Sequence, residues 1–221
     1  AAQRIKNLDL ATALRHAFLG SGGGAVVTSL IERFLYPRLG PGMMWERCRD
    51  LAAERGVETR LQTRVARVLH DGGRVGAVEV VGPDGERRRE DCTALVSSMP
   101  IGHLAEAMDP PAPEPVRAAA RALRYRDFLI VGLVVEREAL FPDNWIYVHS
   151  PEVRVGRVQN FKNWSPEMVD DPALSFIGLE YFVNQGDDLW ARSDESLVAL
   201  GASEAEQIGL LAAREVREGT V

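Results

Sequence analysis

Hydrophobic and polar positions follow two different periods along the chain, and the change between them divides it into blocks. Apolar residues at helical spacing dominate the first part, and Gly40, Pro41 and Gly42 mark a sharp entry into a helix predicted over 43–52. Further along, short alternating runs rich in β-branched residues predict strands. We therefore expect a helical first block, a β-rich second block and a mixed third block, at 1–55, 56–102 and 103–221.

The second block has the pattern of a small β-meander. Its apolar runs predict strands at 57–61, 65–69, 75–81 and 93–98. Asp71-Gly72 and Asp84-Gly85 supply hairpin-turn chemistry between the runs. The last run ends at Pro100, where a buried strand is expected to enter a loop.

The third block mixes strands and helices. Its strongest feature is the run Phe128–Glu136, which is apolar on both faces and predicts a core strand. Antiparallel strands with helices laid against them define an α+β fold, in which a mostly antiparallel sheet is flanked by helices. The other expected elements are helices at 103–108, 116–123 and 193–215 and strands at 144–148, 153–160 and 174–183.

Composition excludes several classes of protein. Of the 221 residues, 46% are hydrophobic and 26% charged, and the longest apolar run is too short to span a bilayer, so we expect no transmembrane segment. A net charge of −6 without a basic stripe argues against nucleic acid as a partner. Cys48 and Cys92 stand far apart and the four histidines share no ligand spacing, so we expect no metal site and a reducing, cytoplasmic location. Peripheral association with a membrane stays open.

A glycine cluster near the start has the spacing of a dinucleotide-binding loop. Gly20, Gly22 and Ala25 match G-x-G-x-x-A, but that loop needs a strand before it and a helix after it. The apolar residues of 10–18 have helical spacing instead. We interpret the glycines as a loop between helices and keep a phosphate loop as the alternative.

Two further patterns concern catalysis. Ser97 and Ser98 lack the G-x-S-x-G elbow of hydrolases, which argues against that class. Glu180 and Tyr181 are neighbours in an expected strand, so one of them faces the interior and could line a pocket. A buried glutamate needs a partner, and the sequence does not reveal which residue that is.

Residues 56–68 and 94–100 resemble the middle of the amine-oxidase and protoporphyrinogen-oxidase group of FAD enzymes. In that group a segment of this layout returns to the flavin domain. The resemblance implies that the backbone of Val65 contacts the adenine of FAD. It also implies that Ser98 and Pro100 lie close to the cofactor.

Residues 34–45 look like the tyrosine-proline and glycine-rich turn that opens a helix in UDP-galactopyranose mutases, which share the flavin fold. This resemblance implies that Gly42 and Met43 belong to the cofactor site.

Residues 144–166 are similar to the eukaryotic-type mutase pattern, in which a tyrosine, an arginine and an aromatic residue line the sugar-nucleotide site. The matching positions are Tyr147, Arg157 and Trp164, with Asn163 beside them; Trp164 stands where the mutases carry tyrosine. Arginine suits a pyrophosphate because its guanidinium pairs two oxygens at once. The alternative is that Arg157 is a surface arginine and Trp164 a core residue.

The resemblance implies a function for a longer enzyme. The chain has no initiator methionine, and we expect it to be an internal piece, inactive alone, that carries the substrate domain and part of the FAD-binding domain of a two-domain flavoenzyme. The expected activity is FAD-dependent oxidation of a small organic substrate. The alternatives are a mutase that acts on a nucleotide sugar through reduced flavin, and a ligand-binding module that is not an enzyme. Neither the sequence nor the resemblance identifies a catalytic residue or an oligomeric state.

Overall fold

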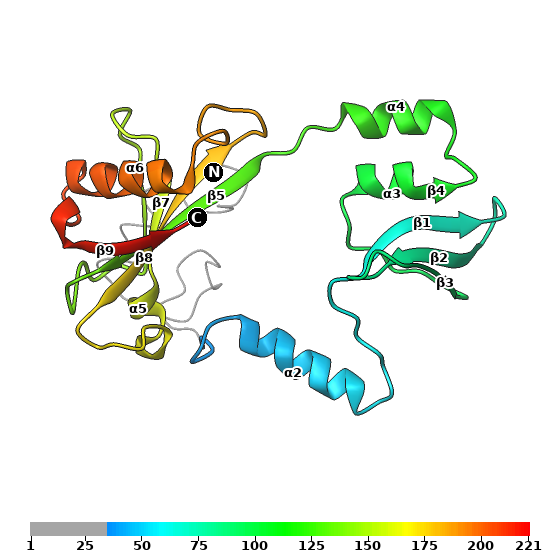
Figure 1. Ribbon diagram of the computed structural model, residues 1–221, viewed down its shortest axis with the longest axis horizontal. Coiled ribbons are helices and arrows are strands. Elements are labelled where there is room, and N and C mark those ends of the chain that lie inside the picture. The colour runs from blue at the N-terminus through cyan, green and yellow to red at the C-terminus, as the bar shows by residue number, and fades with distance from the viewer. Residues whose placement is uncertain (1–34) are drawn as a thin grey trace, which may run out of the picture. The chain divides into compact units, whose positions relative to one another are not determined.

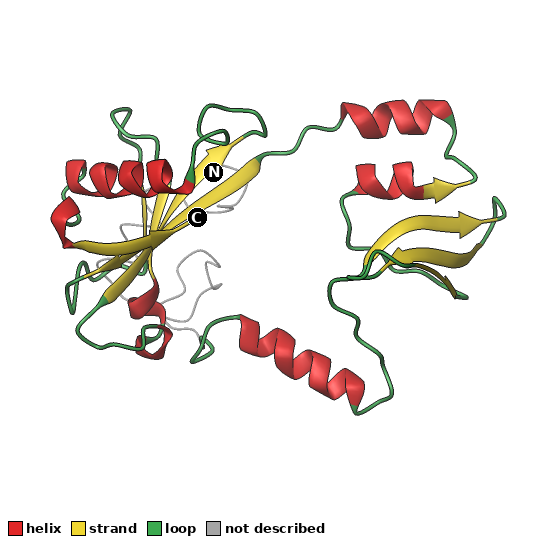
Figure 2. Cartoon of the chain, viewed as in Figure 1, coloured by secondary structure: helices red, strands yellow, loops and turns green. Residues whose placement is uncertain are grey.

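The computed structural model describes residues 35–221. The glycine cluster at Gly20, Gly22 and Ala25 lies outside the described residues. The helices lie beside two sheets that are both mainly antiparallel, so the predicted α+β fold class is confirmed (Figures 1 and 2). The helical segments are α2 (Gly42–Ala53), α3 (Ile101–Ala107), α4 (Glu114–Ala122), α5 (Phe161–Trp164) and α6 (Asp194–Gln207), with 3-10 turns η1 (Pro166–Met168) and η2 (Ala213–Glu215).

The first sheet has four strands in the order β3-β2-β1-β4. Strands β1, β2 and β3 form the antiparallel meander that the alternating runs predict, and Asp71 holds its first turn by accepting hydrogen bonds from the amides of Gly73 (2.9 Å) and Arg74 (2.8 Å). The short β4 pairs in parallel with β1 at Val68 and Leu69. The strands are β1 (Arg64–His70), β2 (Val75–Val81), β3 (Arg87–Asp91) and β4 (Met108–Asp109).

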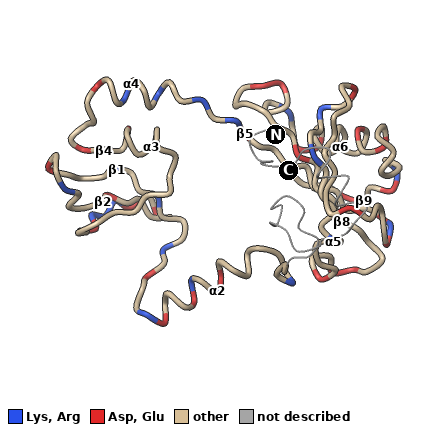
Figure 3. Tube along the Cα trace, turned by 180° about the vertical axis from the view of Figure 1, so that it is seen from behind, with Lys and Arg blue, Asp and Glu red and all other residues tan. Residues whose placement is uncertain are grey.

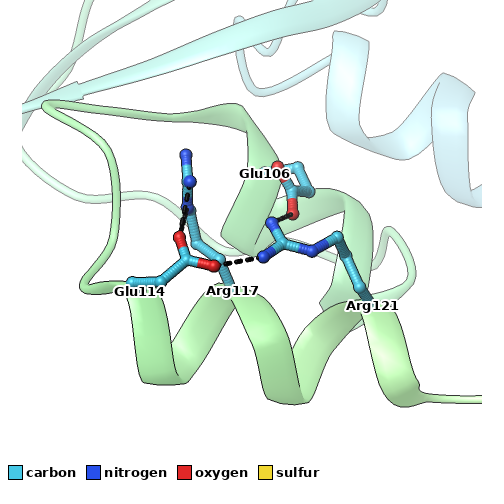
Figure 4. Close-up of polar contacts among 4 residues, drawn as sticks. All are labelled: Glu106, Glu114, Arg117 and Arg121. Carbon is cyan, nitrogen blue, oxygen red and sulfur yellow. Dashed lines mark hydrogen bonds and ion pairs between the residues drawn. The ribbon is translucent and has the colours of Figure 1, made fainter.

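Helices α3 and α4 pack against each other as a hairpin beside β1 and carry a cluster of ion pairs (Figure 4). Arg121 donates to Glu106 of α3 (3.1 Å) and also pairs with Glu114 at the start of α4. Glu114 accepts a second guanidinium, that of Arg117 (2.6 Å). Of these pairs, only Arg121–Glu106 joins the two helices, and exposed pairs such as these add little to stability.

The second sheet has five antiparallel strands in the order β6-β7-β8-β5-β9 and contains the main hydrophobic core. The long β5 and β8 pair along their whole length, as two strongly apolar runs require. The predicted core strand over 128–136 is thereby confirmed. The strands are β5 (Asp127–Val135), β6 (Trp145–Tyr147), β7 (Arg157–Asn160), β8 (Ser175–Val183) and β9 (Val216–Thr220).

Helix α6 closes one face of this sheet (Figure 1). Gly201 lets the helix approach closely, because a Cβ added there would lie 3.1 Å from the side chain of Val131. The odd-numbered apolar positions of β5 and β8 face α6 and are almost completely buried. We call this side the closed face; its members are Leu129, Val131, Leu133, Val135, Ile177, Leu179, Tyr181 and Val183.

Two predicted strands are absent from the structure. The segments 57–61 and 93–98 form no strand, although both carry alternating or apolar residues. A strand needs a hydrogen-bonded neighbour, and neither segment has one among the described residues. Val96 is 97% exposed, so its apolar run is not the buried strand that the sequence suggested.

The predicted closing helix over 193–215 was too long. Helix α6 ends at Gln207, because Gly209 adopts φ +77° and the amide of Leu210 turns back to the carbonyl of Ala205 (2.9 Å). This is the usual glycine stop of a helix. The chain then continues through η2 into the edge strand β9.

Candidate functional site

The second face of the large sheet carries large apolar side chains that nothing in the described chain covers completely. Even-numbered positions of β5 and β8 lie on this side, together with the odd-numbered positions of β6 and β7, because the strands pair in antiparallel register. Five large apolar residues of this side have exposed fractions of 40% to 55%. We call this side the open face; these residues are Phe128, Ile130, Trp145, Tyr147 and Phe182.

A row of cross-strand neighbours runs over the open face from edge to centre. Tyr147 of β6 lies opposite Arg157 of β7, which lies opposite Glu180 of β8, which lies opposite Ile130 of β5. The pairing register alone therefore brings an aromatic ring, a cation and a carboxylate together. Two of the three residues that resemble the mutase pattern, Tyr147 and Arg157, are thus direct neighbours.

A charge pair with a buried carboxylate and a partly exposed guanidinium lies in the middle of this row. Glu180 is 1% exposed, and its two carboxylate oxygens accept hydrogen bonds from Nε of Arg157 and from the side-chain amide of Gln159. The Glu180 hydrogen bond raises the pKa of Arg157, and a contact with Tyr147 adds to the effect. The guanidinium also lies over the Tyr147 ring, 5.8 Å from its centroid. A buried carboxylate is costly unless it is paired in this way.

The short helix α5 covers one end of the open face. Trp164 of α5 packs against Trp145, with ring centroids 4.9 Å apart, so the third residue of the mutase-like pattern also reaches this face. The side chain of Asn163 instead contacts the backbone of the turn before β6. Its side-chain amide donates to the carbonyls of Phe141 (2.8 Å) and Asp143 (3.0 Å) and so holds the turn before β6.

A second buried carboxylate, Glu204 of α6, supports the closed side of β7. It accepts hydrogen bonds from the amides of Arg154 (2.8 Å) and Val155 (3.0 Å) and from the Tyr181 hydroxyl (3.0 Å). Burial raises the pKa of Tyr181, and the Glu204 charge raises it further. Glu204 therefore fixes the segment that leads directly into Arg157.

The residues expected at the cofactor lie in two other segments. Gly42 and Met43 form the first turn of α2, where the Met43 amide donates to the Gly40 carbonyl (3.3 Å). Ser98 and Pro100 lie in the segment before α3, whose first turn closes on the Pro100 carbonyl.

Val65 lies in β1, near an edge that is available to a ligand. Strand β4 pairs with β1 only at Val68 and Leu69, so the backbone beside Val65 has no strand neighbour on that side among residues 35–221. In the segment before α3, the Ser97 hydroxyl is buried without a hydrogen-bond partner in the described structure. A free strand edge and an orphaned hydroxyl both fit a polar cofactor such as FAD.

Several residues of the open face were missed from the sequence. The alternation in 174–183 shows that Glu180 and Tyr181 face opposite sides, but both are buried, each against a different partner. Phe128 and Ile130 belong to a run that is apolar on both faces, which suggests that both faces are covered. The information that would have identified the site is the strand register. Once Arg157 of β7 is placed opposite Glu180 of β8, the carboxylate has the partner that it needs.

Some kinds of site are not found in the part of the chain that the structure describes. No group of three or more His, Cys, Asp or Glu side chains from residues 35–221 could hold a metal ion. None of the described helices has both the length and the apolar character needed to cross a membrane. Cations and anions are interspersed along the chain rather than gathered by sign (Figure 3).

The fold and the family model agree on the class of protein. Residues 8–208 match the family of flavin-containing amine oxidoreductases, so the chain belongs to this family. The family is one of flavin-dependent oxidoreductases, which confirms the resemblance of 56–68 and 94–100. No curated protein matches the chain.

Solved structures show the same fold at low sequence identity. A reduced UDP-galactopyranose mutase has a TM-score of 0.62 and 15% identity, covering 83% of this chain and 38% of the mutase. A protein from Exiguobacterium sp. 255-15, described as a protoporphyrinogen oxidase, has a TM-score of 0.59 and 18% identity over 85% of this chain and 39% of its own. Putrescine oxidase bound to putrescine has a TM-score of 0.53 and 16% identity over 81% and 37%. The chain thus spans about two fifths of the length of these structures.

Proposed function

We propose that this chain is the substrate domain, with part of the FAD-binding domain, of an FAD-dependent oxidoreductase that oxidises a small organic molecule. The observation that carries the proposal is the open face of the second sheet. A sheet with one side closed by α6 and the other lined by half-exposed aromatic rings presents a ready surface for a ligand. Membership of a flavin-dependent family supplies the redox chemistry.

We assign the cofactor contacts to the segments that fit a polar ligand. The strand edge at Val65 and the segment around Ser97, Ser98 and Pro100 would hold part of FAD, and the turn at Gly42 and Met43 would contribute a second contact. When bound, FAD supplies the hydride acceptor. The protein's own part is to orient the substrate on the open face and to exclude water from it.

A mutase-like function is the second candidate. Tyr147 and Arg157 are neighbours on the open face, and Trp164 packs at its end, which is the arrangement that the mutase-like pattern implies. One of the similar structures is a reduced UDP-galactopyranose mutase. In this alternative the flavin acts without net oxidation, and the substrate is a nucleotide sugar.

The experiment that tests the proposal uses a protein in which this chain is continuous with its dinucleotide-binding region. A flavin absorption spectrum is expected, together with its bleaching under anaerobic conditions by a small organic substrate. If the dithionite-reduced protein instead converts added UDP-galactopyranose to UDP-galactofuranose, the mutase is favoured. A protein with no flavin spectrum would contradict both and favour a ligand-binding module.

Phe182→Ala sharpens this test. Its side chain is 45% exposed on the open face, so its loss is expected to slow bleaching about tenfold or more by weakening substrate contact while leaving the flavin spectrum unchanged. Val116→Ala, at a similarly exposed position on α4, serves as the matched control and is expected to leave bleaching unchanged.

A further inference from the structure

We propose that the Arg157–Glu180 pair selects an uncharged substrate with a flat apolar surface, and excludes both anionic and cationic ligands from the open face. This inference rests on the proposed function of that face as the substrate surface. It concerns the chemical class of the substrate, which neither the family nor the similar structures decide.

The first step is the charge of the face. Arg157 is the one cation in the row from Tyr147 to Ile130, and Glu180 directly beside it is the one anion. The carboxylate has both oxygens occupied, one by Arg157 and one by Gln159. The pair therefore presents no net charge to a ligand.

The second step concerns an anionic ligand such as a pyrophosphate. Its attraction to the Arg157 guanidinium is opposed by repulsion from the Glu180 carboxylate, which cannot move away because it is 1% exposed and held by two donors. The guanidinium also has its Nε committed to Glu180, so the fork that would grip two phosphate oxygens is partly used.

The third step concerns a cationic ligand such as a diamine. An ammonium group would need the Glu180 carboxylate, which is 1% exposed and whose oxygens already accept from Arg157 and Gln159. Repulsion from the guanidinium adds to this barrier.

The remaining surface fits a neutral apolar ligand. Phe128 and Phe182 pack with ring centroids 5.6 Å apart on β5 and β8, and Trp145 and Tyr147 supply further half-exposed rings on β6. Such rings bind a flat apolar surface by stacking and by burying area. The Arg157 N–H groups that Glu180 does not use can donate to a neutral carbonyl or hydroxyl oxygen of the ligand.

Titration of the full 221-residue chain with three probes tests the inference without any flavin. The probes are N-phenyl-1-naphthylamine, which is neutral and aromatic, UDP, which is anionic, and putrescine, which is cationic at neutral pH. The neutral probe is expected to bind with a rise in its fluorescence, and an excess of UDP or putrescine is expected not to displace it. Phe182→Ala should weaken the binding of the neutral probe, whereas Val116→Ala, in the apolar groove between α3 and α4, should not.

Charge variants then identify the pair as the cause. Glu180→Gln keeps the shape but frees the Arg157 charge, and is expected to tighten UDP binding by on the order of tenfold. Arg157→Gln with Glu180→Gln restores a neutral pair and should return UDP binding to that of the unmodified chain. Arg154→Gln, which removes an exposed arginine paired with Asp188, is the matched control and should change nothing. Circular dichroism of each variant separates a binding effect from a loss of fold.

Two binding results would overturn the inference. One is that the unmodified chain binds UDP or putrescine at least as tightly as the neutral probe. The other is that Glu180→Gln, while folded, leaves UDP binding unchanged. A flavoprotein that bleaches with a charged substrate would also reject the selection but keep the proposed function. A protein without flavin would reject the proposed function, and the three-probe titration would then report only which ligands the face binds, not the class of a substrate.

Discussion

The two faces of the large sheet are both apolar, yet they differ in what covers them. On the closed face, Leu133 and Leu179 are completely buried beneath α6, and the Tyr181 hydroxyl is bonded to Glu204. On the open face, Phe128 and Phe182 keep 44% and 45% of their surface exposed, and only the Glu180 carboxylate of the charge pair beside them is buried. The same strands therefore carry a folding core on one side and, on the other, the half-exposed surface that we propose binds the ligand.

Because of this difference, we expect residues that matter for stability to alternate with residues that matter for ligand binding along a single strand. Alternate residues of β5 and β8 belong to different faces, so neighbours in sequence should respond to substitution in different ways. Closed-face changes should lower the free energy of unfolding, and open-face changes should mainly alter ligand binding. The predictions below test this division, from the largest expected effect to the smallest.

Leu179→Ala is expected to be the most damaging change. Leu179 is fully buried in the centre of β8, and removing its side chain leaves a cavity under α6. The expected loss is about 3 kcal/mol in the free energy of unfolding, measured by urea denaturation. A loss below about 1 kcal/mol would show that α6 does not close this face tightly.

Glu204→Gln should have the next largest effect. The variant places an amide donor where a carboxylate oxygen accepts, so one of the donors, the amides of Arg154 and Val155 or the Tyr181 hydroxyl, loses its acceptor. The expected loss is about 2 kcal/mol by urea denaturation. Glu195→Gln, at an exposed position in the first turn of the same helix, is the control and should cost less than about 1 kcal/mol. Equal losses in the two variants would contradict a special role for Glu204.

The raised pKa of Tyr181 predicts how stability depends on pH. The unfolded tyrosine loses its proton near pH 10.0, whereas the folded one keeps it, because burial and the Glu204 charge oppose ionisation. The unfolded state therefore binds fewer protons above that pH, and stability falls as pH rises, by up to about 1.4 kcal/mol per pH unit from this group.

The measurement compares the unmodified chain with Tyr181→Phe at several pH values from about 9 to about 11. The variant lacks the hydroxyl, so it is expected to lose about 1 kcal/mol at neutral pH but to show the shallower decline above pH 10. Parallel declines in the two proteins would mean that Tyr181 ionises equally well in the folded state.

The closed face could be predicted from the sequence more fully than the open one. Runs such as 128–136 carry enough apolar residues to indicate a core strand, and a core needs no further information than burial. The helix end at Gly209 was also visible in the sequence but was overlooked in favour of continued helical spacing. Segment 93–98 shows the opposite error, because an apolar run predicts a strand only when a neighbour is present to pair with it.

The open face depends on contacts between distant residues, which periodicity does not contain. Arg157 and Glu180 lie on different strands, and only the register of β7 with β8 makes them a pair. The family resemblance groups Tyr147, Arg157 and Trp164 because it carries such tertiary information indirectly, and whether they bind a ligand stays a prediction. It did not reveal that Glu180 neutralises Arg157.

Ile130→Thr is expected to have the smallest effect on stability. It tests the comparison of the two faces with a residue of the open face. Ile130 is 40% exposed on the open face, one residue from the fully buried Val131, and threonine keeps the β-branched shape that a strand favours. The expected change is within about 0.5 kcal/mol by urea denaturation. Val131→Thr is the matched control, because the same kind of change buries a hydroxyl under α6 and should cost about 2 kcal/mol. If Ile130→Thr lost as much as Val131→Thr, the open face would be part of the folding core, and its exposed rings would no longer argue for a ligand.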